Sequence, residues 1–233
     1  MRTLDITVTK QITMDKTPLF VGDIHGEYDK LIELLIKAGF EYRDEKLVSD
    51  TYELVSVGDQ VDRGPNSKGV LDMRIKHAVL GNHDWKILRW LSGRDVVISH
   101  GAETTVSELE NLSDEEKEDI IKYYESLPLQ LIINDKYLVV HGAMKDDHLG
   151  AKLKRAQKSC LYGLPTGEFN EDGSPVRGPE WWNDYTLPYT CIYGHTPQED
   201  IFIANNTINI DTGCVFGGKL TAYDPENDIV YQV

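Results

Sequence analysis

The hydrophobic pattern of the chain alternates between strand-like and helix-like stretches. Short apolar runs bounded by glycine or by turn-forming residues predict buried strands. These runs lie at residues 18–21, 54–57, 77–80, 129–133, 137–140, 190–193, 207–210, 220–223 and 229–233. Asn134 and Asp135 between two runs, and a short polar segment between the last two, predict hairpins. A weaker alternation over residues 2–14 predicts an edge strand or hairpin.

Helical spacing separates several of these strands. After the first run, apolar residues follow a helical repeat at Leu31, Leu34, Leu35 and Ala38. Gly39 then ends the predicted helix. Ser113 and Glu116 form a capping box that opens an acidic helix over residues 114–125. Further helices are predicted over residues 67–76, 84–92 and 145–159.

The order of these elements predicts an α/β fold, with strand–helix alternation first and mainly strands later. No repeat or linker divides residues 1–233, which predicts a single domain. Residues 94–128 and 160–188 depart from the pattern, and the second segment is a predicted long loop rich in Gly, Pro, Asn and Asp. Long loops in compact domains usually carry function, so both segments are predicted to form a cap that selects the substrate.

The charge balance excludes one class of partner. The chain has 39 acidic and 24 basic residues, for a net charge of −15. Proteins that bind long nucleic acids use a basic surface, so extended nucleic-acid binding is not expected. No apolar stretch reaches the ~20 residues that span a bilayer, and the first residues lack an apolar signal core. A cytoplasmic protein without membrane contact is expected, and the sequence does not indicate its oligomeric state.

Polar side chains follow six of the predicted strands. Each is Asp, Asn or His, each lies at or just after a strand end, and most have glycine beside them. They are Asp23, Asp59, Asn82, His141, His195 and Asp211. Ligands of α/β sheets gather at the carboxyl ends of the strands. The six side chains are therefore predicted to converge on one site.

The chemistry of this set predicts a metal centre. Carboxylate, amide and imidazole donors without a thiolate favour Mn, Fe or Zn ions over a structural zinc site. The set offers more donors than one ion needs, which predicts two ions, with Asp59 as the carboxylate that bridges them. Such a pair of ions clamps an anionic substrate and activates a water. Asp62 and Arg63, in the turn after Asp59, place carboxylate and guanidinium groups where they suit a metal and a phosphate.

Five motifs resemble the signatures of the PPP-type, calcineurin-like metallophosphoesterases. In chain order they are Gly22-Asp23-Ile24-His25-Gly26, Gly58-Asp59-Gln60-Val61-Asp62-Arg63-Gly64, Gly81-Asn82-His83-Asp84, His141-Gly142 and Gly194-His195. The resemblance covers residues 18–223 and is closest to a bacterial and phage branch. That branch includes the lambda-phage protein phosphatase, PrpE-like proteins, symmetrical diadenosine tetraphosphate hydrolases and the phosphatase domain of bacterial polynucleotide kinase-phosphatase. It implies a β-sandwich flanked by helices, in four α/β/β/α layers, and the host cytoplasm as location if the protein is phage-encoded.

The resemblance also implies a role for each residue. The ligands of two divalent metal ions would be Asp23, His25, Asp59, Asn82, His141 and His195. Manganese is the first choice, with Fe, Zn or Ni as alternatives. His83 would be the general acid, oriented by Asp62. Arg63 and Asn82 would contact the substrate phosphate.

Two residues are assigned through the similarity of residues 160–163, 173–177 and 210–221 to the PrpE and polynucleotide-phosphatase group. Arg177 would be a second phosphate-binding arginine, or else a surface residue of a long loop. Asp211 would lie beside the metal site, against His25. The sequence departs from the family pattern at His100-Gly101, which could be the metal-ligand pair in place of His141-Gly142. His141 is preferred because it follows a clearer strand pattern.

The remaining histidines carry less specific expectations. His100 is expected near the substrate or in a structural role. His77 is expected in packing or at the surface, and His148 is expected to face solvent.

These residues predict an enzyme that hydrolyses phosphomonoesters with a water activated by two metals. The leading hypothesis is a serine/threonine protein phosphatase, with phosphotyrosine as a further target. The alternative is a nucleotidic hydrolase: a symmetrical diadenosine tetraphosphate hydrolase or a polynucleotide end phosphatase or phosphodiesterase. The motifs of residues 160–220 favour the alternative. A binding protein that has lost catalysis is disfavoured because every catalytic position is present.

Overall fold

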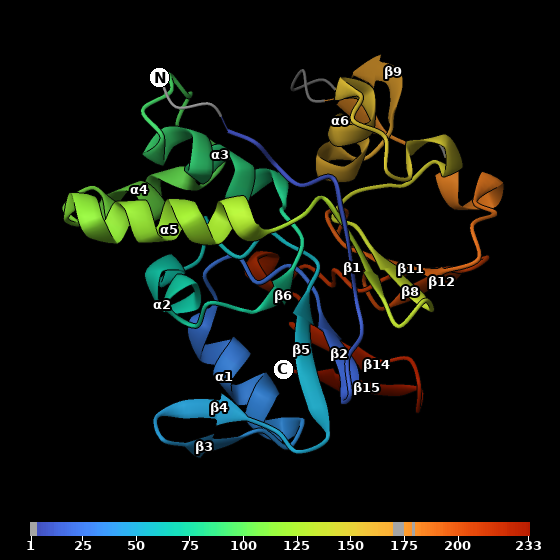
Figure 1. Cartoon of the computed structure of the whole chain (residues 1–233), viewed down its shortest axis with the longest axis horizontal. Helices are drawn as coiled ribbons and strands as arrows, with labels where there is room; N and C mark the ends of the chain where they lie inside the picture. The colour runs from blue at the N-terminus through green and yellow to red at the C-terminus, as the bar shows by residue number, and fades with distance from the viewer. Residues whose placement is uncertain (1–3, 170–174, 179) are drawn as a thin grey trace.

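The computed structural model describes residues 4–169, 175–178 and 180–233 (Figure 1). Its helices are α1 (Tyr28–Lys37), α2 (Ser67–Asp72), α3 (Asn82–Leu91), α4 (Ala102–Leu109), α5 (Asp114–Ser126) and α6 (Lys154–Tyr162). Short 3-10 helices are η1 (Asp146–His148), η2 (Trp181–Asp184) and η3 (Cys214–Phe216). In Figure 1, α3, α4 and α5 lie together on one side of the molecule, and α6 with β9 lies on the other.

Two larger sheets form the centre of the fold. One sheet has the order β15-β14-β2-β5-β6, and the other has the order β1-β7-β8-β11-β13-β12. The first is built from β2 (Thr17–Val21), β5 (Tyr52–Ser56), β6 (His77–Ala78), β14 (Thr221–Asp224) and β15 (Ile229–Gln232). The second is built from β1 (Thr9–Ile12), β7 (Gln130–Ile133), β8 (Tyr137–Val139), β11 (Thr190–Tyr193), β12 (Phe202–Ala204) and β13 (Thr207–Asn209).

The core confirms the layered α/β/β/α arrangement. One buried cluster contains Phe20 and Val55 from the first sheet with Val139 and Ile192 from the second, so the two sheets pack against each other. A larger cluster joins the outer strand residues to the helices, with Leu34 of α1 as one member. The alternation of side chains along each strand explains this division, because successive residues point to opposite faces of the sheet.

The strand directions bring the predicted site residues to one edge. Strands β2, β5 and β6 pair in parallel, as do β8, β11 and β13. Their carboxyl ends therefore lie side by side within each sheet. The six predicted residues follow these six strands, three in each sheet: Asp23, Asp59, Asn82, His141, His195 and Asp211.

Several local predictions need correction. Residues 160–188 are not only loop, since their described part includes the end of α6, the hairpin of β9 (Pro165–Phe169) and β10 (Pro175–Arg177), and η2. Helix α4 was not predicted because its Thr104, Thr105 and Val106 are weak helix formers. The hairpin of β3 (Glu41–Arg43) and β4 (Lys46–Val48) was also not predicted.

Element bounds and one histidine differ as well. The helices predicted over residues 67–76 and 145–159 are the shorter α2, and η1 followed by α6. Strand β6 is shorter than predicted, and α3 begins at Asn82. The weak N-terminal pattern forms β1, parallel to β7. His148 is buried, not solvent-facing, because η1 folds over Gln130, whose Nε2 donates to the His148 carbonyl at 2.8 Å.

Candidate active site

Asp59 lies at the centre of the cluster, between the two sheets. Its Oδ1 accepts the backbone N–H of His83 at 2.9 Å. Its Oδ2 lies 3.2 Å from Nε2 of His141 and 3.7 Å from Nε2 of His25. The carboxylate thus faces residues that follow β2 on one side and β8 on the other, as a bridging ligand must.

Two groups of donor atoms share Asp59. One group is His25, Asp59 and His83, and the other is Asp59, His141 and His195, with the ligand atoms of each group within 4.8 Å of one another. Asn82 adjoins the second group, with Oδ1 3.1 Å from Nε2 of His141. Two groups that share a carboxylate fit a pair of divalent ions.

The hydrogen bonds of two histidines support this fit. Nδ1 of His25 lies 2.9 Å from the Val61 carbonyl, and Nδ1 of His141 lies 3.0 Å from the Val57 carbonyl. A carbonyl accepts from an N–H, so Nδ1 carries the proton in each ring. With Nδ1 held by a carbonyl, Nε2 is the nitrogen that faces Asp59, which is the arrangement of metal-binding histidines.

Asp23 lies beside the cluster, in a position different from that of the other ligands. Its two carboxylate oxygens each accept the backbone N–H of His195, at 3.2 Å. In place of Asp23, His83 completes the first donor group. The structure therefore brings His25, Asp59, Asn82, His141 and His195 together, with Asp23 at the backbone of His195.

Several site residues have a backbone conformation that side chains rarely adopt. The φ angles are 48° at His25, 48° at Asp59, 75° at Asp62, 72° at Arg63 and 71° at His195. Positive φ costs energy in non-glycine residues and recurs at functional sites. The turns after β2, β5 and β11 are thus held by their surroundings in the conformation that aims these side chains inward.

Glycines allow the close approach of carboxylates in this cluster. A Cβ at Gly81 would collide with Oδ1 and the backbone nitrogen of Asp59, and a Cβ at Gly194 would collide with Oδ1 of Asp23. The glycines that adjoin Asn82 and His195 in the motifs are therefore required by space.

His83 and Asp62 form a buried pair. Nδ1 of His83 lies 2.6 Å from Oδ2 of Asp62. The backbone N–H of Asp62 donates to Ser67 Oγ at 3.0 Å and to Thr105 Oγ1 at 2.9 Å, which holds the backbone of the turn that carries this carboxylate. The predicted orientation of His83 by Asp62 matches this geometry.

Arg63 lies at the open side of the cluster. Its Nη1 is 2.5 Å from Nε2 of His25, and its guanidinium lies 5.0 Å from the ring centroid of the exposed Phe216. The Arg63 backbone N–H donates to the Gly101 carbonyl at 2.9 Å. The segment that contains His100 thus lies against the site through Gly101, and His100 itself is exposed.

Burial and the charges of neighbouring side chains shift the pKa values of the cluster. Burial, and then the neighbouring carboxylate of Asp211, raise the pKa of Asp23 well above its usual range. Burial opposes ionisation of Asp59, but His141 and His83 hold its pKa well below the usual range. Burial opposes the charge on His141, but Asp59 and Asp23 raise its pKa to about 9. Such a concentration of acidic groups attracts cations.

Two predicted residues have a less complete description. Asp211 is buried beside Asp23, and burial raises its pKa to about 6. The backbone of Arg177 pairs with Pro165 in the β9–β10 hairpin, but its side chain lies outside the part of the chain that the structure describes.

The structure adds residues whose role sequence reasoning missed. Asp84 accepts the N–H of Gly81 and that of Gln60, each at 3.0 Å, and so joins α3 to the turn after β5. Its place in the Gly81–Asp84 motif was a signal for this role. Lys86 donates to the Ser99 carbonyl at 2.8 Å and anchors the segment behind Arg63. No sequence signal marked Lys86.

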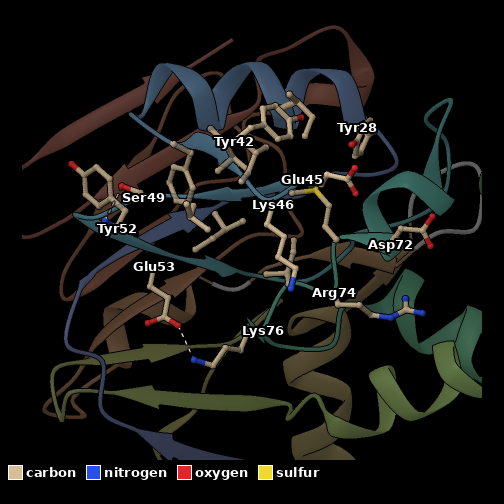
Figure 2. Close-up of a pocket in the computed structure, with 18 of the residues that line it drawn as sticks. Tyr28, Tyr42, Glu45, Lys46, Ser49, Tyr52, Glu53, Asp72, Arg74 and Lys76 are labelled. Atoms are coloured by element: carbon tan, nitrogen blue, oxygen red, sulfur yellow. Dashed lines mark hydrogen bonds and ion pairs between the residues drawn. The ribbon is translucent and has the colours of Figure 1, made fainter.

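One cavity of the described residues is remote from this cluster. It has a volume of about 880 Å³ and lies between α1, the β3–β4 hairpin, β5 and α2 (Figure 2). Tyr52 of its lining begins β5, whereas Asp59 follows the other end of that strand.

The described helices are also too short or too polar to span a membrane.

Comparisons with known proteins agree with the fold and the motifs. The family model for calcineurin-like phosphoesterases matches residues 17–230. An asymmetrical bis(5'-nucleosyl)-tetraphosphatase PrpE from Halalkalibacterium halodurans is 43% identical over 215 residues, which is 87% of each chain. A crystal structure provisionally assigned as a diadenosine tetraphosphatase covers 97% of both chains with a TM-score of 0.67 and 24% identity.

Protein phosphatases share the fold at lower similarity. A serine/threonine phosphatase structure from Saccharomyces cerevisiae has a TM-score of 0.61 and 19% identity, with 94% of this chain and 76% of that chain covered. The chain is 43% identical to the PrpE protein and only 19% identical to this phosphatase, which overturns the leading prediction of a serine/threonine protein phosphatase. The prediction failed because the five motifs indicate a metal and phosphate site and carry no signal for the group attached to the phosphate.

Proposed function

The chain belongs to the calcineurin-like phosphoesterase family and is a hydrolase of that family. We propose that it is an asymmetrical bis(5'-nucleosyl)-tetraphosphatase. The observation that carries the proposal is 43% identity to a protein of that name over 87% of both chains. The reaction is the hydrolysis of one phosphoanhydride bond, which yields a nucleoside triphosphate and a nucleoside monophosphate. The alternative predicted from the sequence included a hydrolase that cleaves diadenosine tetraphosphate symmetrically.

The donor set assigns the metal site of this proposal. His25, Asp59, Asn82, His141 and His195 would hold two divalent ions, with Asp23 as a further ligand next to His195. The bound ions would supply Lewis-acid polarisation of a phosphoryl oxygen and a water of lowered pKa. Manganese suits this mixture of carboxylate, amide and imidazole donors, and availability selects among Mn, Fe, Zn and Ni.

The chain's own residues position the substrate and move a proton. Arg63, at the open side of the cluster, binds oxygens of the phosphoryl group under attack, and Asn82 and Arg177 are further phosphate ligands. His83 donates its proton to the departing phosphate oxygen, and Asp62 holds the imidazole ring at Nδ1 so that Nε2 faces the substrate.

Product analysis tests this proposal. Diadenosine tetraphosphate is incubated with the enzyme and defined Mn²⁺, and the nucleotides are separated by ion-exchange chromatography. Equal amounts of ATP and AMP are expected, with ADP absent at early times. ADP as the initial product, or turnover of a phosphopeptide without turnover of the dinucleotide, contradicts the proposal. A His83→Ala variant controls for contaminating hydrolases.

A further inference from the structure

A second cavity, of about 780 Å³, lies between α3 and α6. Trp85 and Arg89 line it from α3, and Lys154, Lys158 and Tyr162 line it from α6. Residues 4–9 form its remaining wall, and Figure 1 shows this segment passing between the two helices on its way to β1. We call this cavity the α3–α6 groove.

The groove carries positive charge on an acidic protein. Its charged lining residues are Asp5, Arg89, Lys152, Lys154 and Lys158. Four cations and one carboxylate give a local charge of +3, while the whole chain has a net charge of −15. In such an acidic chain, most basic side chains are expected to lie near acidic ones. A cluster of basic side chains therefore points to an anionic ligand.

The cations of the groove have no partners within the described part of the chain. Among the described residues, no hydrogen bond or ion pair involves the side chains of Arg89, Lys152, Lys154 or Lys158. The remote cavity of Figure 2 is different, because Lys76 pairs with Glu53 at 2.9 Å there. Arg74 of that cavity likewise pairs with Asp119, at 2.5 Å. Among the described residues, the groove therefore brings several cations without ion-pair partners together with aromatic rings, whereas Arg74 and Lys76 of the other cavity are paired.

Both helices connect the groove to the metal cluster. Asn82, Trp85 and Arg89 are spaced i, i+3 and i+7 along α3, so they share one face of the helix. Arg89 lies ~10 Å along the helix axis from Asn82, whose Oδ1 contacts His141. At the other helix, the Cys160 carbonyl of α6 accepts the N–H of Gly142 at 2.6 Å.

We propose that the α3–α6 groove binds the part of a dinucleoside polyphosphate that lies beyond the cleaved phosphate. Arg89, Lys154 and Lys158 pair with phosphate oxygens, and Trp85 or Tyr162 stacks on the distal base, since an aromatic ring stacks on any base. This inference rests on the proposed function, and it explains how a strongly acidic protein holds a polyanionic substrate whose length exceeds that of the metal cluster.

Substrate comparison in paired variants tests the groove. The ratio of kcat/KM for diadenosine tetraphosphate to kcat/KM for p-nitrophenyl phosphate is measured for Lys154→Ala/Lys158→Ala. Each exposed ion pair contributes up to ~fivefold, so the ratio is expected to fall about tenfold. The matched control is Arg155→Ala, because Arg155 belongs to the same helix and pairs with Asp147 at 3.3 Å. The control should stay within twofold, and a ratio unchanged in the double variant overturns the proposal.

A binding measurement separates failure of the groove from failure of the proposed function. Inorganic tripolyphosphate is titrated calorimetrically into the wild type and the double variant, without any turnover. Loss of affinity in the variant supports the groove even if diadenosine tetraphosphate is not cleaved, in which case only the proposed function fails. Equal affinity of the two proteins overturns the groove while leaving the product analysis intact. Lys154 and Lys158 are exposed, so their replacement leaves the core unchanged.

Discussion

Nδ1 of His83 lies 2.6 Å from Oδ2 of Asp62, and both side chains are buried next to Asp59. The contact determines that Nδ1 of the ring is held by the protein, which leaves Nε2 for the proposed proton transfer. A carboxylate that orients an imidazole in this way keeps it in one tautomer. The pair gives the most direct test of the catalytic assignment.

The His83→Ala variant is expected to lose a factor of roughly 10²–10⁴ in kcat, the usual contribution of a general acid. Bound Mn per chain, measured by mass spectrometry after gel filtration, should be unchanged. His83 also belongs to one of the donor groups, so metal loss in the variant would reassign it as a ligand. Full activity of the variant would remove it from the mechanism.

Asp59→Asn is expected to lower both metal content and activity, because both donor groups share this carboxylate. An asparagine keeps the size of the side chain but has one fewer acceptor oxygen and no charge. Chelation of the wild type with EDTA should abolish turnover, and added Mn²⁺ should restore it. The same treatment should not restore the variant at equal Mn²⁺. Asp135→Asn, in the β7–β8 turn, is the control for loss of one carboxylate.

Gly81→Ala is expected to destabilise the protein by ~1–3 kcal/mol, the usual cost of overpacking. The added Cβ would collide with Asp59 and displace it. The loss of activity should exceed what the fraction of unfolded protein accounts for, since the displaced residue is the proposed bridging ligand. Gly93→Ala is the control, because open space surrounds Gly93 and only its φ of 73° opposes alanine. That control should lose ~1–2 kcal/mol and retain activity.

The three cysteines are expected to resist alkylation in the folded protein. All are buried, and burial raises the pKa of Cys160 and of Cys214 to about 11. The thiolate is the reactive form, so at pH 8 about one thiol in a thousand is reactive for a pKa of 11. Iodoacetamide labelling should be slow below pH 9, rise with pH, and become complete in guanidinium chloride. Rapid labelling of the native protein at pH 7 would contradict this burial.

The sequence determined the positions of the six parallel strands and the Asp, Asn and His residues that follow them. This was possible because hydrophobic periodicity and glycine turns are local properties, and parallel strands present the same end to one edge. His141 rather than His100 lies in the donor group around Asp59, because it follows β8 within the second sheet.

Only the tertiary structure decided the contacts between segments far apart in the chain. The anchoring of Ser99 by Lys86 and the positive groove between α3 and α6 both join residues from different elements. Their spacing in sequence carries no periodic signal, since packing of helices against sheets determines which faces meet. For the same reason the motifs predicted a metal and phosphate site but gave the wrong leading substrate, because no motif describes the surfaces that would recognise the group attached to the phosphate.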